Sequence, residues 1–254
     1  MAILQIKNLV KSYKEAGGIL KGVSMDVERG EVVVILGPSG CGKSTLLRCV
    51  NGLESIQGGE ILLDGELISN RSKDMHLVRQ KIGMVFQSYD LFPNLTVLKN
   101  VLLGPIKAQK RDKAQVTAQA EQLLERVGLL EKKDAYPRQL SGGQRQRVAI
   151  VRALCMNPEI LLFDEVTAAL DPEMVREVLD VMMALAKENR TMLIVTHQLE
   201  FARAVADRIV FIDDGVIVEE GKPDEFFASP KTERARKFLD AFKFEKRVSY
   251  ADGI

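Results

Sequence analysis

The pattern of apolar and polar positions changes several times along the chain, and three short segments are almost continuously apolar. These segments cover residues 31–36 (EVVVIL), 159–165 (EILLFDE) and 191–197 (TMLIVTH). Runs of this length, rich in β-branched and aliphatic residues, are typical of strands buried on both faces of a sheet. Because helix-forming segments lie between such runs, the pattern predicts an α/β fold with a parallel sheet and crossover helices.

The helix between the second and third runs has a clear start. Asp171 is a suitable N-cap, and Pro172 occupies the first helical position. Beyond them, apolar residues recur at helical spacing: Val175, Val178, Leu179, Met182 and Leu185. This stripe, its methionine included, predicts a helix face that packs on the core rather than on a cofactor.

Two other regions alternate apolar and polar residues, as antiparallel strands with one solvated face do. Residues 4–10 (LQIKNLV) and 22–30 (GVSMDVERG) follow this pattern near the N-terminus. Asp64-Gly65 and Asp214-Gly215 each lie between apolar runs and predict β-hairpins. We therefore expect an N-terminal antiparallel β subdomain beside the parallel core.

The stretch from 88 to 156 is helical in character and interrupts the strand–helix alternation. Leu123, Leu124 and Val127 share one helix face, and Gly128 is expected to cap or interrupt that helix. The polar run 109–115 (QKRDKAQ) predicts a solvated helix start. We predict one domain in three parts: a core with the β subdomain (1–87 and 157–242), an inserted α-helical subdomain (88–156) and a C-terminal tail (243–254).

The residues after the first apolar run carry the most specific chemistry. "GPSGCGKS" (37–44) fits the pattern G-x-x-x-x-G-K-[ST] between a predicted strand and a predicted helix, which is the context of a phosphate-binding loop. In such a loop Lys43 reaches the β- and γ-phosphates, and the Ser44 hydroxyl coordinates magnesium. The predicted nucleotide contacts are Gly37, Pro38, Ser39, Gly40, Cys41, Gly42, Lys43, Ser44 and Thr45. The core is therefore expected to have the P-loop NTPase (RecA-like) fold.

Polar residues follow the other apolar runs, where parallel strands deliver their carboxyl ends to one edge of the sheet. Asp164 is predicted to hold magnesium through its water shell, and Glu165 to polarise an attacking water. His197 is predicted to contact the γ-phosphate. Gln87 follows a further apolar run. Either its amide contacts magnesium or the attacking water, or it is an ordinary loop glutamine.

A second loop suits an anion, although it lies a hundred residues from the first. "LSGGQRQRVAIVRAL" (140–154) places a hydroxyl, two glycines and an amide before a predicted helix, whose first N–H groups are free to bind. From the residues alone, the phosphate that this loop contacts is not defined.

Composition narrows the class of protein. A net charge of +1, 46% hydrophobic and 28% charged residues give no sign of a nucleic-acid surface. The cysteines at 41, 49 and 155 lack paired spacing, which favours a reducing compartment, and two histidines without a CxxC pattern make a zinc site unexpected. Neither a secretory signal nor an apolar run of about 18 residues, the length that spans a bilayer, is apparent. If the protein acts at a membrane, we therefore expect it to bind there through a partner.

Taken together, these motifs resemble the ATP-binding subunits of ABC transporters along nearly the whole chain. The resemblance rests on "GPSGCGKST", "MVFQ", "LSGGQ", "ILLFDE", "AALD" and "VTH", in the family's order and spacing. "LSGGQ" is the family's signature and the most specific of them. Val166 and Ala168 replace the Pro and Ser common in "DEPTSALD", and Gln198 replaces a common Glu. None of these departures is at a catalytic position.

The resemblance implies roles that spacing alone does not. Tyr13 would stack on adenine, Gln87 would be the Q-loop glutamine, Asp171 the D-loop aspartate, and His197 the switch histidine. The signature loop, formed by Ser141, Gly142, Gly143 and Gln144, would contact ATP held by a second copy of the chain. ATP and Mg²⁺ are the implied cofactors.

The resemblance also implies partners and a location. The tracts "LFPNLTVLKNV", "DAYPRQLSGGQ" and "VADRIVFIDDGVIVEEG" resemble subunits that power polar amino-acid importers. Such subunits bind transmembrane permeases at the cytoplasmic face of the membrane, and a separate extracytoplasmic protein delivers the solute. The alternatives are an ABC transporter for another solute and a soluble ABC ATPase in DNA repair or on the ribosome.

Two local features allow two interpretations each. Cys41 lies at a helix N-terminus, which predicts a lowered thiol pKa and alkylation that inhibits unless ATP protects; alternatively it is a small residue that fits the loop. Tyr89, Leu91 and Phe92 resemble the surface where a permease helix docks, or they pack inside the helical subdomain.

Overall fold

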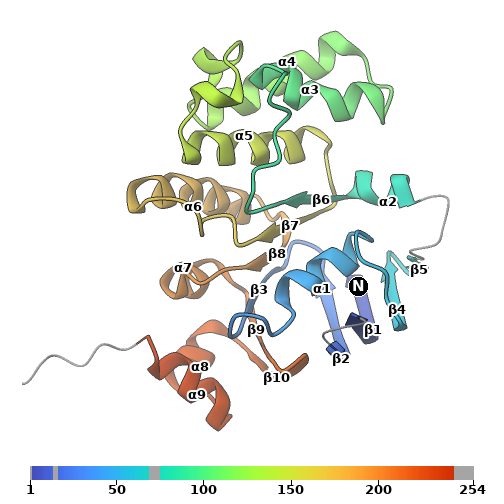
Figure 1. Cartoon of the computed structure of the whole chain (residues 1–254), viewed down its shortest axis with the longest axis vertical. Helices are drawn as coiled ribbons and strands as arrows, with labels where there is room; N and C mark the ends of the chain where they lie inside the picture. Colours follow the sequence, from blue (N-terminus) through green and yellow to red (C-terminus); the bar gives the residue numbers. More distant parts are fainter. Residues whose placement is uncertain (1, 14–16, 69–74, 243–254) are drawn as a thin grey trace, which may run out of the picture.

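The computed structural model describes residues 2–13, 17–68 and 75–242, and the first of its two sheets is antiparallel (Figure 1). In order across this sheet, its strands are β2 (Gly17–Glu28), β1 (Ala2–Tyr13), β4 (Gly58–Leu63) and β5 (Glu66–Leu67). The predicted hairpin at Asp64-Gly65 is confirmed, because Leu63 pairs with Glu66 and both turn residues have positive φ.

The second sheet is the predicted parallel core. Its order is β10 (Val216–Gly221), β9 (Arg208–Asp213), β3 (Val32–Leu36), β8 (Thr191–Val195), β7 (Ile160–Asp164) and β6 (Ile82–Val85). All five strands from β9 to β6 run parallel, and β10 pairs antiparallel with β9 through the hairpin at Asp214-Gly215. Strands β3, β7 and β8 are buried at every position, as their continuous apolar sequences predict.

Helices cover both faces of this sheet. The described helices outside the 88–156 stretch are α1 (Lys43–Val50), α2 (Met75–Lys81), α6 (Pro172–Lys187), α7 (Leu199–Val205), α8 (Pro223–Ala228) and α9 (Glu233–Asp240). Because side chains alternate along a strand, Val33 and Ile35 of β3 pack with α1 and the antiparallel sheet, whereas Val34 and Leu36 pack with α5 to α9 on the other face. The sheet therefore separates two hydrophobic cores.

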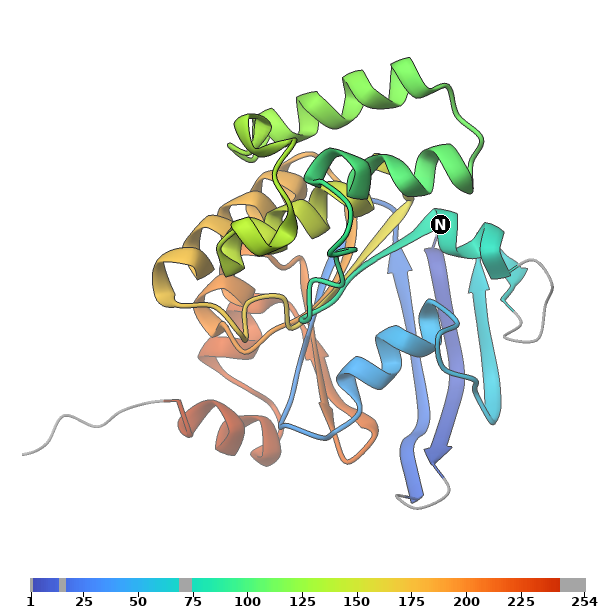
Figure 2. The same ribbon diagram turned by 45° about the horizontal axis from the view of Figure 1, so that its top comes forward.

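Between β6 and β7 the chain is helical, and Figures 1 and 2 show these helices gathered at one end of the molecule. They are α3 (Val97–Lys107), α4 (Lys113–Arg126), η1 (Leu130–Lys132), η2 (Pro137–Gln139) and α5 (Gly142–Cys155). Asp112 caps α4 inside the run 109–115, and Gly128 (φ 69°) follows its C-terminus, where the N–H of Leu129 donates to the carbonyl of Leu124.

Helix α5 is buried on two sides. Ala149, Ile150 and Leu154 join the core that contains Val34 and Leu36 of β3. Val148 and Val151 join a third core with α3 and α4. The helix therefore links the sheet to the other helices of this end. The predicted tail at 243–254 lies outside the described residues.

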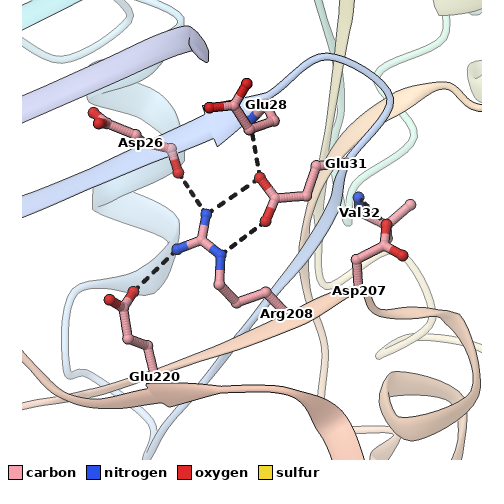
Figure 3. Close-up of polar contacts among 7 residues, drawn as sticks. All are labelled: Asp26, Glu28, Glu31, Val32, Asp207, Arg208 and Glu220. Carbon is pink, nitrogen blue, oxygen red and sulfur yellow. Dashed lines mark hydrogen bonds and ion pairs between the residues drawn. The ribbon is translucent and has the colours of Figure 1, made fainter. Parts of the chain in front are cut away.

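An ion-pair network joins the two sheets (Figure 3). Arg208 of β9 donates through Nε to Glu31 Oε1 (2.8 Å), through Nη1 to Glu220 Oε2 (3.0 Å), and through Nη2 to the carbonyl of Asp26 on β2. Burial alone would lower the pKa of Arg208, but its bonds with Glu31 and Glu220 outweigh burial and raise it. One half-buried side chain thus connects β2, β9, β10 and the start of β3.

We expect Arg208→Met to lower the free energy of unfolding by about 1–3 kcal/mol. Removing one partner of a buried pair costs roughly 3–5 kcal/mol, and the partial exposure of Arg208 reduces this. Urea unfolding followed by circular dichroism measures the change. Arg203→Met is the matched control, because Arg203 pairs with the exposed Asp224 and should contribute under about 1 kcal/mol. Equal losses in the two variants would contradict the role of Arg208.

Within the described ranges, no helix combines the length and apolar character needed to cross a bilayer.

Candidate nucleotide-binding site

The predicted polar residues meet at one edge of the parallel sheet. Strands β3, β6, β7 and β8 run in the same direction, so their carboxyl ends, at Leu36, Val85, Asp164 and Val195, lie along the same side. Four connecting segments leave this edge: the phosphate loop at 37–42, the turn with Gln87, Glu165 and the residues that follow it, and the segment with His197. The topology therefore brings these four sequence motifs to one region.

The glycines of the phosphate loop are required by close packing. Gly37 has φ 152°, and a Cβ there would lie 2.0 Å from the carbonyl oxygen of Ile212. Gly42 has φ 104° and caps α1; its Cβ would lie 2.8 Å from the Leu20 side chain. A side chain at either position would displace the loop from β2 or β9. The backbone can therefore form a cradle ahead of the N-terminus of α1.

Lys43, the first residue of α1, is buried, and its ammonium group folds back onto the loop. Nζ donates to the carbonyl oxygens of Gly37 (2.9 Å) and Pro38 (2.8 Å). Among the described residues, Lys43 forms no ion pair with a carboxylate. A third contact of Nζ is to the Cys41 sulfur (4.0 Å). A buried cation whose partners in the described part of the chain are two carbonyls and a thiol, in front of a glycine cradle, suits an anionic ligand such as a phosphate.

Ser44 and Asp164 provide hard oxygen atoms beside this cradle. The Ser44 hydroxyl donates to Asp164 Oδ1 (2.5 Å), and Arg48 Nη2 lies 3.7 Å from Oδ2. Burial raises the pKa of Asp164 above its usual value, partly opposed by the Ser44 hydrogen bond and the Arg48 charge. Oxygen ligands of this kind fit Mg²⁺, which takes its remaining ligands from water and substrate phosphates.

Glu165 and His197 form the second polar pair. His197 Nε2 lies 3.0 Å from Glu165 Oε1. The Glu165 N–H donates to the carbonyl of Val195 (3.0 Å), and the residue has a positive φ of 48°, which turns the chain sharply after β7. The turn separates the directions of the two adjacent carboxylates, because Asp164 contacts Ser44 whereas Glu165 contacts His197.

The other predicted residues have contacts of their own. Gln87 is exposed on the turn after β6, and in the described part of the chain no hydrogen bond joins it to Ser44 or Asp164. Asp171 is exposed and caps α6, accepting from the N–H of Met174 (3.1 Å). Tyr13, 37% exposed, lies over the Lys11 ammonium (4.7 Å to the ring centroid). Burial and a hydrogen bond with Glu54 raise the pKa of Tyr13, while Thr45 lowers it.

The signature loop caps the N-terminus of helix α5. Ser141 Oγ accepts from the N–H of Gln144 (3.2 Å), and Gln144 Oε1 accepts from the N–H of Ser141 (3.0 Å), which completes a capping box. The Gly143 N–H lies 3.2 Å from Met174 Sδ, and a Cβ at Gly143 would lie 2.8 Å from Met174 Cβ. Helix α5 therefore starts in close contact with the N-terminal turn of α6.

In the segment after Gln87, one side chain is exposed, as a docking surface requires, and another is packed inside the protein. Phe92 is 46% exposed, whereas Leu91 packs against the core between the parallel sheet and its helices and against the third core with α3 and α4. Sequence reasoning missed Asn100, which is fully buried and organises this segment: it accepts from the N–H of Phe92 and donates to carbonyls of Phe92, Leu95 and Thr96. A lone Asn within an apolar helix pattern is the signal that could have identified it.

Cys41 differs from its sequence-based prediction. Its helix N-terminal position suggested a lowered thiol pKa, but burial raises the pKa of Cys41, and the nearby Lys43 charge opposes that effect only in part. The prediction of an activated thiol is therefore wrong. Desolvation of the thiolate outweighs the helix N-terminus because the side chain is buried against Gly37.

We expect native Cys41 to react with iodoacetamide at pH 7 at least about tenfold more slowly than in an unfolded peptide of the same sequence. Mass spectrometry of each tryptic fragment over time measures the rate. Cys155 is the internal control, since burial raises its pKa to about 11. A native rate equal to the peptide rate would contradict the burial of Cys41.

These features define a P-loop NTPase. A glycine cradle precedes α1 and a buried lysine follows the cradle, and the Ser44–Asp164 and Glu165–His197 pairs lie at the carboxyl edge of a parallel sheet. The model of the ABC transporter family matches residues 20–168, more than half of the 254-residue chain. The chain belongs to the ABC transporter family.

Similar proteins cover nearly the whole chain. The glutamine transport ATP-binding protein of Bacillus subtilis is 56% identical over 93% of the chain and 98% of its own length. The glutamate/aspartate import ATP-binding protein of Escherichia coli is 52% identical over the same shares. Among solved structures, cbiO1 from Clostridium perfringens, part of an ABC transporter complex, has a TM-score of 0.81 at 33% identity, with 95% of each chain covered.

A second solved structure bears on assembly. It is a dimeric ATP-binding cassette in a post-hydrolysis state, bound to ADP and Pi, with a TM-score of 0.77 at 36% identity; 87% of this chain and 98% of that chain are covered. The fold that carries the site here is therefore the fold of a cassette solved as a nucleotide-bound dimer.

Proposed function

We propose that the chain hydrolyses ATP and energises an importer of polar amino acids. The observation that carries the proposal is the convergence of a buried Lys43, the Ser44–Asp164 pair and the Glu165–His197 pair at one edge of the parallel sheet. Phosphate chemistry needs a cation for the phosphates, oxygen ligands for magnesium and a base near the attacking water. All three types of group are present there.

Residue roles follow from this arrangement. Lys43 and the loop from Gly37 to Thr45 would hold the phosphates, and Ser44, Asp164 and Gln87 would hold magnesium. Bound magnesium neutralises charge on the phosphates. Glu165 accepts a proton from the attacking water, and His197, hydrogen-bonded to Glu165, contacts the γ-phosphate. Tyr13 stacks on adenine.

The signature loop indicates a dimer. Ser141, Gly142, Gly143 and Gln144 present a capped helix N-terminus, and we infer that this loop contacts ATP held by the second copy, with Asp171 beside it. The similarity to a cassette solved as a dimer with ADP and Pi supports this. In this arrangement the 88–156 stretch acts as a moving subdomain against the core, and hydrolysis depends on protein concentration.

Amino-acid import rests on the relatives. Their names specify glutamine, glutamate, cystine and arginine transport, at 51–56% identity. Because these identities are nearly equal, they support the class of polar amino acids and do not select one solute. The inferred partners are transmembrane permeases, which place the chain at the cytoplasmic face of the membrane, and indirectly an extracytoplasmic solute-binding protein. No nucleic-acid partner is proposed.

The test is purification of the tagged chain from detergent-solubilised membranes, identification of the bound permease by mass spectrometry, and reconstitution of the complex. We expect ATP-dependent uptake of a radiolabelled polar amino acid when the cognate solute-binding protein is present. Recovery of ribosomes or DNA-repair proteins without a permease would favour the soluble alternative, and uptake of another solute class would contradict amino-acid import.

A further inference from the structure

Helix α5 holds the turn that follows Gln87. Arg152, on the last full turn of α5, donates from Nη2 to the carbonyl of Tyr89 (3.1 Å) and from Nη1 to the carbonyl of Asp90. The two acceptors are adjacent backbone carbonyls, and one planar guanidinium reaches both. This contact connects residues 62 and 63 positions apart in the sequence.

The turn itself is strained and needs such support. Tyr89 (φ 61°) and Asp90 (φ 46°) are consecutive non-glycine residues in the left-handed region. Residues in this region persist where surrounding contacts hold them. Among the described residues, the hydrogen bonds within the turn join Ser88 and Asp90: the Asp90 N–H donates to the Ser88 carbonyl (2.7 Å), and Ser88 Oγ donates to Asp90 Oδ1 (2.8 Å).

Two further side chains of α5 contact the same segment. Gln146 is fully buried and donates from Nε2 to the carbonyl of Phe86 (3.2 Å), the residue before Gln87. The Arg145 guanidinium lies over the Tyr89 ring, 5.0 Å from its centroid. Arg145 and Arg152 are seven residues apart, about two helical turns, so they lie on the same face of α5. Gln87 is thus flanked on both sides by residues attached to one helix.

That helix begins at the signature loop. A Cβ at Gly142 would lie 3.2 Å from the Tyr89 hydroxyl, so the turn also reaches the start of α5. Since α5 is packed in two cores, it behaves as a rigid element. We propose that Arg152 is a positioning residue for ATP hydrolysis, whose guanidinium holds the Tyr89–Asp90 turn on α5 so that Gln87 and the signature loop move as one body.

This inference rests on the proposed function, in which Gln87 contributes to the magnesium site. Arg152→Met keeps the length of the side chain and removes both hydrogen bonds. We expect kcat of the reconstituted transporter to fall by about 10–100-fold, as mispositioned groups in active sites do, with KM for ATP within about twofold. The Mg²⁺ concentration for half-maximal ATPase should rise about threefold or more, a change that a loss of folded protein would not produce.

Arg152→Lys and Arg236→Met provide the comparison. The lysine variant retains one charged donor and should recover part of kcat. Arg236 donates to a single backbone carbonyl, that of Lys231, on the surface of α9, and its replacement should leave kcat and the Mg²⁺ dependence unchanged. Wild-type values in Arg152→Met would overturn the proposal.

A double-mutant cycle with Gln87→Ala decides whether Arg152 acts through Gln87. If it does, Arg152→Met lowers kcat less than about twofold when Gln87 is already alanine. If the two effects multiply, the proposal is wrong. Should Arg152→Met fail to fold, Arg152→Lys takes its place in the same cycle. A wild-type transporter without ATPase activity would instead refute the proposed function, so the two failures are distinguishable.

Discussion

Glu165→Gln is expected to lower kcat for ATP hydrolysis by about 10²–10⁴-fold while ATP binding remains. The amide has the same shape as the carboxylate but cannot accept a proton from the attacking water. It retains an oxygen that accepts a hydrogen bond, so the contact with His197 (3.0 Å) and the turn at Glu165 are preserved. Phosphate release in the steady state gives kcat, and equilibrium titration with a fluorescent ATP analogue gives the affinity.

The same variant tests the inferred dimer. With ATP bound and hydrolysis blocked, the two copies should remain closed, and light scattering coupled to gel filtration should show twice the monomer mass only when ATP is present. Glu225→Gln is the matched control, because Glu225 is exposed on α8 and none of the sequence motifs of the site includes it. Normal turnover in Glu165→Gln would remove Glu165 from the role of base.

Lys43→Ala is expected to have the second largest effect, a loss of about 10²–10³-fold in kcat/KM. Removing one preorganised charged donor costs roughly this much, and Lys43 is the cation already buried beside the cradle, bonded to the Gly37 and Pro38 carbonyls. Unlike Glu165→Gln, this variant should also lose affinity for ATP. The same two assays measure both quantities.

Lys21→Ala is the control for Lys43→Ala. Lys21 is half exposed and pairs with the exposed Asp214, so its removal should change kcat/KM by less than about twofold. Because Lys43 is buried, the thermal stability of Lys43→Ala should be measured alongside, so that a loss of folded protein is separated from a loss of phosphate binding. Hydrolysis at near wild-type rates in a folded Lys43→Ala variant would contradict the role of this loop.

The parallel sheet and its edge were predictable because they depend on local and topological rules. The runs at 31–36, 159–165 and 191–197 are apolar at almost every position, and a strand buried on both faces permits little else. Once the strands are parallel, their carboxyl ends meet, so Asp164 and His197 were expected near Lys43. The capping box at Ser141 and Gln144 is likewise a local pattern.

The contacts of α5 were not predictable in the same way. Arg145, Gln146 and Arg152 look like polar positions on a helix, and Tyr89 and Asp90 look like loop residues. Their pairing joins parts of the chain about sixty residues apart, and no periodicity encodes which distant carbonyl a guanidinium reaches. Cys41 shows the same limit, since its pKa depends on the side chains and carbonyls that bury it.

The sequence by itself determined the strands, the caps, the phosphate loop and the signature, because each follows from residue spacing within about ten positions. The tertiary structure alone decided that Glu165 faces His197 while Asp164 faces Ser44, that Cys41 is desolvated, and that α5 carries the turn beside Gln87. The physical reason is that burial, and the hydrogen bonds it demands, depend on what the folded chain brings together from distant positions.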